Sequence, residues 1–240
     1  MSQPFARELL AVSPAQFLHI LPLMGKLMIT ARAHGATHER IGTVERVEAS
    51  DGHVALLGAE HDSRFDLSAI HSLVADRTGR MGEMELPRVD ILDEGGEAIA
   101  SVVGFGGLAP FDAALATLPT GTELAPKEPA PAAERGEVAD NDPGRTPFDL
   151  AMAKGLPISV EFRRPGFHQR WQGAVETVKP AMGFINLMRA DFHLHLKAGA
   201  VARWEASTGP TGSEWTALDA AGNPLGLRVS GPADAFSAAG

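Results

Sequence analysis

Two histidines near the end of the chain have a spacing that suits metal chemistry. They occur in Phe192-His193-Leu194-His195-Leu196, and side-chain alternation along a strand would put both histidines on one face. Two imidazoles on one face can give a metal ion two ligands, or one ligand and a hydrogen-bond donor. The next acidic residue is Glu205, too distant for a cupin-type site. A histidine pair without any ligand is therefore an equally weighted alternative.

The chain repeats its own pattern at a separation of 131 residues. The clearest pair is Gly42–Val47 and Gly173–Val178, and the offset holds without a gap as far as Ala75. Chance rarely produces an ungapped match over about 34 positions, so we interpret the pattern as an internal duplication.

This register defines which polar positions correspond to the histidines. Arg64 of the first copy matches His195 of the second, and Asp62 matches His193. These four positions are the candidate sites of chemistry.

Two shorter segments extend the repeat. His38-Glu39-Arg40 faces His168-Gln169-Arg170 after a slip of one residue, and Leu92–Gly96 resembles Leu218–Gly222 after a deletion. We interpret the recurring triplet as shared structure, since catalysis would not require it in both copies.

The elements expected to position these residues are mostly short strands. Ser13-Pro14 predicts the start of a short helix that ends near Pro22, and 111–118 reads as a second helix. Short apolar runs separated by turn residues predict antiparallel strands at 27–33, 42–47, 53–57, 64–67, 73–75, 88–92 and 98–103. Asp93–Glu97 and Ala220–Pro224 read as tight hairpin turns.

The domain organisation follows from the repeat and from composition. We predict an α+β fold with two tandem sheet-rich repeats, residues 1–118 and 148–231, that form a pseudo-twofold pair of stacked antiparallel sheets with flanking helices. Residues 119–147 are rich in Pro, Ala and Glu and read as a flexible linker, and 232–240 as a tail.

Composition excludes several classes of function. The net charge of −9 and the interspersed basic residues argue against nucleic-acid binding. Cysteine is absent from the sequence, which removes thiolate metal sites and cysteine nucleophiles and is compatible with a reducing cytoplasm. The sequence also lacks a Gly-x-Ser-x-Gly elbow, a P-loop and a dinucleotide fingerprint. The start of the chain and its apolar runs lead us to expect neither export nor membrane insertion.

The order of motifs resembles that of the HemS/ChuX-type haem-utilisation proteins, whose longer members are tandem duplications. The resemblance is carried by Met28–Arg32, His38–Gly42 and Asp62–Phe65 in the first half, and by Val160–Gly166, Gln169–Gly173 and Gly183–Leu196 in the second. It covers most of the chain outside the linker and both termini.

This resemblance implies two stacked antiparallel sheets, a cytoplasmic setting and haem bound in a cleft. In that family an arginine of the first unit reaches the iron side of the haem, and Arg64 stands at the matching position. A guanidinium there could order a bound water or pair with haem charge.

The chain also departs from the family. The family's axial histidine lies between the two units, whereas this sequence has no histidine between His71 and His168. Ala206–Thr211 replaces a basic segment expected after the histidine pair, and the late aromatic position is lost near Ser230. His195 or His193 would then be the available iron ligands by their chemistry.

We therefore predict a cytoplasmic haem-binding protein that carries haem, stores it or helps to degrade it, with enzymatic activity left undecided. Haem is the expected cofactor and partner, and a homodimer stays open. One alternative is a haem-free interaction or regulatory module that kept the fold. Another is a small metal site at His193 and His195.

Overall fold

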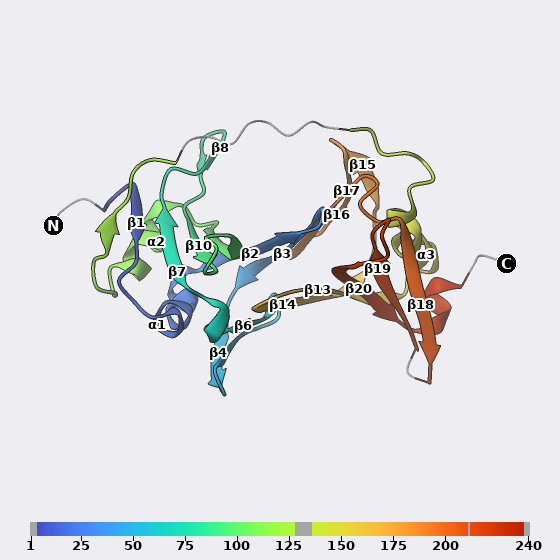
Figure 1. The fold of residues 1–240 in the computed structure, drawn as a ribbon, viewed down its shortest axis with the longest axis horizontal. Coiled ribbons are helices and arrows are strands. Elements are labelled where there is room, and N and C mark those ends of the chain that lie inside the picture. Colours follow the sequence, from blue (N-terminus) through green and yellow to red (C-terminus); the bar gives the residue numbers. More distant parts are fainter. Residues whose placement is uncertain (1–3, 128–135, 211, 238–240) are drawn as a thin grey trace. The chain divides into compact units, whose positions relative to one another are not determined.

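The computed structural model describes residues 4–127, 136–210 and 212–237 (Figure 1). Strands dominate it, and helices are few and short. The strands form a ten-stranded and an eight-stranded antiparallel sheet, together with a two-stranded ribbon. The predicted sheet-rich architecture with two large antiparallel sheets is therefore confirmed. No helix in the described part of the chain has the length and apolar composition of a membrane span.

The first part of the chain carries twelve strands. They are β1 (Arg7–Leu9), β2 (Lys26–Ala33), β3 (Ala36–Thr43), β4 (Arg46–Ser50), β5 (His53–Leu57), β6 (Asp62–Asp66), β7 (Ser72–Asp76), β8 (Arg80–Met81), β9 (Met84–Glu85), β10 (Arg88–Leu92), β11 (Ala98–Gly104) and β12 (Thr122–Glu123). Its helices are α1 (Pro14–His19) and α2 (Leu108–Leu115), with the 3-10 turns η1 (Leu21–Met24) and η2 (Leu67–Ala69).

The second part carries eight strands. They are β13 (Pro157–Arg164), β14 (Phe167–Ala174), β15 (Lys179–Ala181), β16 (Phe184–Met188), β17 (Phe192–Lys197), β18 (Arg203–Gly209), β19 (Gly212–Leu218) and β20 (Pro224–Gly231). The helix α3 (Thr146–Lys154) and the 3-10 turns η3 (Pro143–Arg145) and η4 (Ala233–Phe236) complete it.

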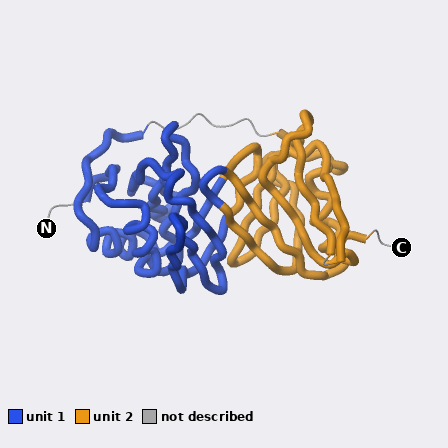
Figure 2. The backbone as a smooth tube through the Cα atoms, turned by 60° about the horizontal axis from the view of Figure 1, so that its bottom comes forward, with its two compact units in different colours: residues 1–31, 39–131, 165–167 blue, residues 32–38, 132–164, 168–240 orange. Residues whose placement is uncertain are grey.

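The chain divides into two compact units, shown in different colours in Figure 2. The first comprises residues 1–31, 39–131 and 165–167, and the second comprises 32–38, 132–164 and 168–240. In the first unit, β12, β1, β7, β10, β11 and β2 are neighbours in that order, and β4, β5 and β6 form a separate set. In the second unit, β15, β16 and β17 form one set, and β18, β19, β20, β13 and β14 form the other.

Strand bounds recur at the offset read from the sequence. Pro157 of β13 follows Lys26 of β2 by 131 residues, and Phe184 of β16 follows His53 of β5 by the same number. After the deletion, Pro224 of β20 follows Ala98 of β11 by 126 residues. The repeat is therefore visible strand by strand.

The predicted one-residue slip near His38 is wrong. β14 starts 131 residues after β3, so the counterpart of His38 is Gln169. Both side chains are fully buried, and they hydrogen-bond to each other at 2.9 Å. A one-residue slip would have turned the buried side of β14 outwards, because successive side chains point to opposite faces.

Local signals explain several elements. The Ser13 hydroxyl accepts the Gln16 main-chain N–H and the Gln16 side chain accepts the Ser13 main-chain N–H, so α1 begins with a capping box. The expected hairpin turns are confirmed by the pairs Asp93 N–H to Glu97 C=O and Asp219 N–H to Asn223 C=O, each 3.0 Å.

Other predicted elements need correction. The predicted strand at 42–47 straddles the junction of β3 and β4, where the Thr43 N–H binds the Glu60 carboxylate instead of a neighbouring strand. The second helix begins at Leu108, three residues before the predicted start. Within the predicted linker 119–147, β12 pairs with β1 and η3 precedes α3, while residues 128–135 lie outside the described residues. Within the predicted tail, η4 is described and residues 238–240 are not.

Candidate functional site

The strand β17 presents the two candidate histidines on one side. Phe192, Leu194 and Leu196 are fully buried, whereas His193 and His195 are half-buried. The alternation predicted from the sequence is therefore confirmed, and the apolar side of the strand anchors it in the core. Phe192 stacks on Trp171 with ring centres 4.5 Å apart and planes 10° apart, which restricts movement of the strand.

Asn186 orients the ring of His195. The two residues face each other across β16 and β17, with the Asn186 Oδ1 2.6 Å from the His195 Nδ1. The Asn186 Nδ2 donates to the main-chain carbonyls of Lys179, Ala181 and Phe184 at 3.1, 3.2 and 2.9 Å. Carbonyl oxygens only accept hydrogen bonds, so the amide nitrogen must face them and Oδ1 must face the imidazole.

This arrangement specifies the tautomer of His195. An amide oxygen cannot donate a hydrogen bond, so the His195 Nδ1 carries the proton. The neutral ring then keeps the lone pair on Nε2. His195 is thus prepared to act through Nε2 as a ligand or a base.

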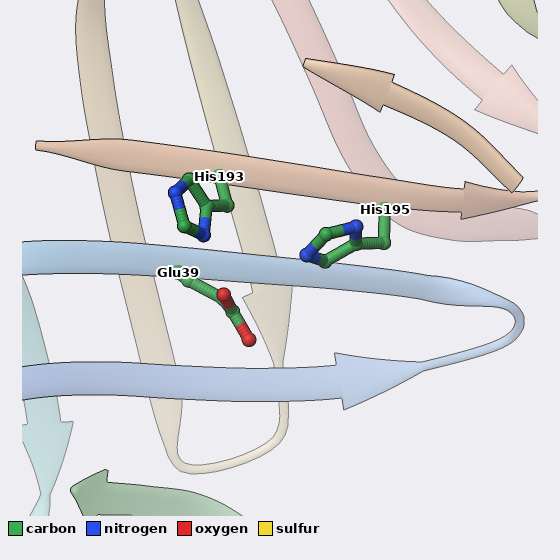
Figure 3. Close-up of side chains that lie close together, drawn as sticks. All are labelled: Glu39, His193 and His195. Carbon is green, nitrogen blue, oxygen red and sulfur yellow. The ribbon is translucent and has the colours of Figure 1, made fainter. Parts of the chain in front are cut away.

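Figure 3 shows the two histidines together with one acidic side chain. The ring centres of His193 and His195 lie 5.9 Å apart. One potential ligand atom each from Glu39, His193 and His195 lies within 4.8 Å of the other two. Glu39 escaped the sequence reading because it stands far from the histidines along the chain. The signal that could have found it is the polar alternation along its own strand.

Arg64, the remaining predicted site residue, stands on a different sheet. It is an exposed residue of β6, opposite Ala55 of β5, and belongs to the eight-stranded sheet. β17 belongs to the ten-stranded sheet. The structure therefore brings His193 and His195 together, while Arg64 belongs to another group of strands.

A carboxylate of the second unit forms a polar cluster that the sequence reading missed. Glu161 accepts hydrogen bonds from the His168 Nε2 at 3.1 Å and from the Arg163 Nη2 at 2.9 Å. The hydrogen bond from His168, supported by Arg163, lowers the pKa of Glu161 to about 2 against the opposing effect of burial. The alternation of Ser159, Glu161 and Arg163 along β13 was the available signal.

Glu161 also lines a cavity of about 620 Å³ in the second unit. The walls come from β13, β14, β18, β19 and β20, and their side chains are mainly polar, including Ser159, Arg170, Gln172, Ser207 and Glu214. Typical small-molecule sites are lined mostly by apolar and aromatic groups, so this cavity favours a polar ligand surface.

Comparison with known proteins shows which fold these strands build. No protein-family model matches the sequence, and no curated protein matches it. The structure is similar to the haem-degrading enzyme ChuS of Escherichia coli O157:H7, with a TM-score of 0.77 and 19% identity over 94% of this chain and 81% of that chain. It is also similar to apo-PhuS, a haem-binding protein from Pseudomonas aeruginosa, with a TM-score of 0.74 and 19% identity over the same shares. The chain thus has the fold of these two proteins along nearly its whole length.

Proposed function

We propose that the protein binds haem in the cytoplasm and carries it, stores it or assists its degradation. The observation that carries this proposal is the shared fold, which extends over 94% of the chain in the comparisons with ChuS and with PhuS. Function depends on sites as well as on folds, so the donor groups of this chain must also suit the ligand.

The available donor groups are compatible with haem. The Nε2 of His195 keeps a lone pair in the orientation imposed by Asn186, and imidazole is a common axial ligand of haem iron. His193, on the same side of β17, is the second candidate ligand. Arg64 is exposed and offers a guanidinium for a carboxylate or an iron-bound water. Bound haem would supply the iron centre that these residues hold or orient.

Two observations favour the haem-free module as the competing function. The sequence has no histidine from residue 72 to residue 167, where the resembling family carries its iron ligand. The cavity of the second unit has mainly polar walls, although a porphyrin needs apolar ones. A module that kept the fold but lost the ligand would have both features.

A haemin titration separates these functions. Purified protein should shift the haemin absorbance at one equivalent, and a variant carrying Arg64→Ala, His193→Ala and His195→Ala should lose that shift. His71→Ala, a change at an exposed histidine of the first unit, is the control and should behave like the unsubstituted protein. Absence of any shift would replace haem binding by the haem-free function. A shift that persists in the triple variant would overturn the residue assignment.

We also propose that residues 1–118 and 148–231 are repeats of one duplicated unit with a pseudo-twofold relation, joined by a linker at 119–147. The recurring strand bounds support this proposal, because β2, β3 and β5 each have a counterpart 131 residues later.

A further inference from the structure

The histidine pair of β17 has a second capacity that does not depend on haem. We propose that His193 and His195 bind one divalent transition metal ion of the zinc or cobalt class. His195 contributes Nε2, and Asn186 is the positioning residue that makes this nitrogen available.

The separation of the rings fits a shared ion. With metal–nitrogen distances of about 2.1 Å, two imidazoles on one tetrahedral ion have ring centres roughly 5 to 6 Å apart. The ring centres of His193 and His195 are 5.9 Å apart, with planes at 69°. Small rotations about the side-chain bonds can therefore direct both rings at one ion, while the buried leucines of β17 hold the strand in place.

The surroundings of His195 match what metal-binding histidines require. A histidine ligand usually donates its other ring N–H to an oxygen, which sets the tautomer and the ring orientation. Asn186 supplies this oxygen at 2.6 Å, and three carbonyls of the β15–β16 hairpin hold its amide in one orientation. A histidine with a merely structural role would not need an acceptor that is itself fixed by three hydrogen bonds.

The remaining coordination positions have suitable donors. Glu39 offers a carboxylate oxygen, as Figure 3 shows, and water can complete a tetrahedral shell. Imidazole and carboxylate ligands suit zinc and cobalt, whereas the absence of cysteine from the chain disfavours softer ions that prefer thiolates.

Cobalt provides a direct test because its visible absorbance reports coordination. Purified full-length protein without a His-tag, titrated with Co²⁺, should bind one ion per chain, and Zn²⁺ should displace it. His193→Ala and His195→Gln should each weaken binding at least tenfold, and Asn186→Ala should weaken it about 10- to 100-fold. His71→Ala is the matched control, because it removes an exposed histidine outside the pair. Lack of saturable binding, or binding unchanged by His195→Gln, would overturn the proposal.

A measurement on the metal-free protein keeps the test independent of folding defects in the variants. The imidazole ¹⁵N shifts of His195 should show a protonated Nδ1 and an unprotonated Nε2 in the unsubstituted protein. A protonated Nε2 in the neutral ring would contradict the role of Asn186. Neither measurement contains haem, so their results stand apart from the outcome of the haemin titration.

Discussion

Replacement of His61 by leucine should remove a pH-dependent loss of stability from the first unit. His61 is 1% exposed, and neither ring nitrogen makes a hydrogen bond of standard geometry with a described residue. Burial lowers the pKa of His61 from 6.5 to about 4, and Arg40 adds to the shift while the Gly42 main chain and Glu60 oppose it.

The size of the effect follows from the two pKa values. Between pH 6.5 and pH 4 the unfolded chain binds a proton at His61 that the folded chain does not, so the free energy of unfolding falls as the pH falls. A difference of about 2.5 pKa units corresponds to about 3 kcal/mol lost between pH 7 and pH 4. Leucine has a similar volume and no titrating group, so the variant should lack this loss.

Urea unfolding at pH 7 and at pH 4 measures the difference. The decrease in the free energy of unfolding between the two pH values should be about 3 kcal/mol smaller in His61→Leu than in the unsubstituted protein. At pH 7 the variant should be close to neutral or more stable, because it removes buried polar atoms that lack partners. Ile91→Val, a change in the core of the same unit, is the control and should cost about 1 kcal/mol equally at both pH values. Equal decreases in His61→Leu and the unsubstituted protein would refute the reasoning.

Two further substitutions test the packing of each unit by urea unfolding at pH 7. Arg77→Ala should cost about 3 kcal/mol, since it leaves Asp112 and the buried Glu8 without the guanidinium that they bind at 2.6 and 3.1 Å; a cost below about 1 kcal/mol would show that the ion pairs are unimportant. Gly226→Ala should cost at least about 2 kcal/mol, because Gly226 has a φ of +80° and an added methyl would overlap the Arg163 carbonyl oxygen; an unchanged midpoint would contradict that crowding.

Local sequence patterns were sufficient for features that depend on neighbouring residues. The cap of α1 involves only Ser13 and Gln16, and the hairpin turn at Asp93 involves only the four residues that follow it. The common face of His193 and His195 follows from strand alternation alone. The same holds for the repeat, whose register is a property of the sequence.

Strand boundaries were harder to predict where long-range contacts compete with local pattern. The junction of β3 and β4 falls inside a run with high strand propensity, because the Glu60 carboxylate binds the Thr43 N–H. The counterpart of His38 likewise depended on which side chains the core accepts. Gln169 is fully buried, whereas His168 faces Glu161 instead.

The chemistry of individual side chains depended on partners that only folding supplies. The reactive nitrogen of His195 is set by Asn186, nine residues away on the neighbouring strand, and by the three carbonyls that hold it. The low pKa of Glu161 requires His168, which the β13–β14 hairpin places beside it. Residue type and spacing thus identified the histidine pair as a candidate site, because alternation is a local property. Protonation states depend on distances of a few ångströms between different strands, and the tertiary structure alone sets those distances.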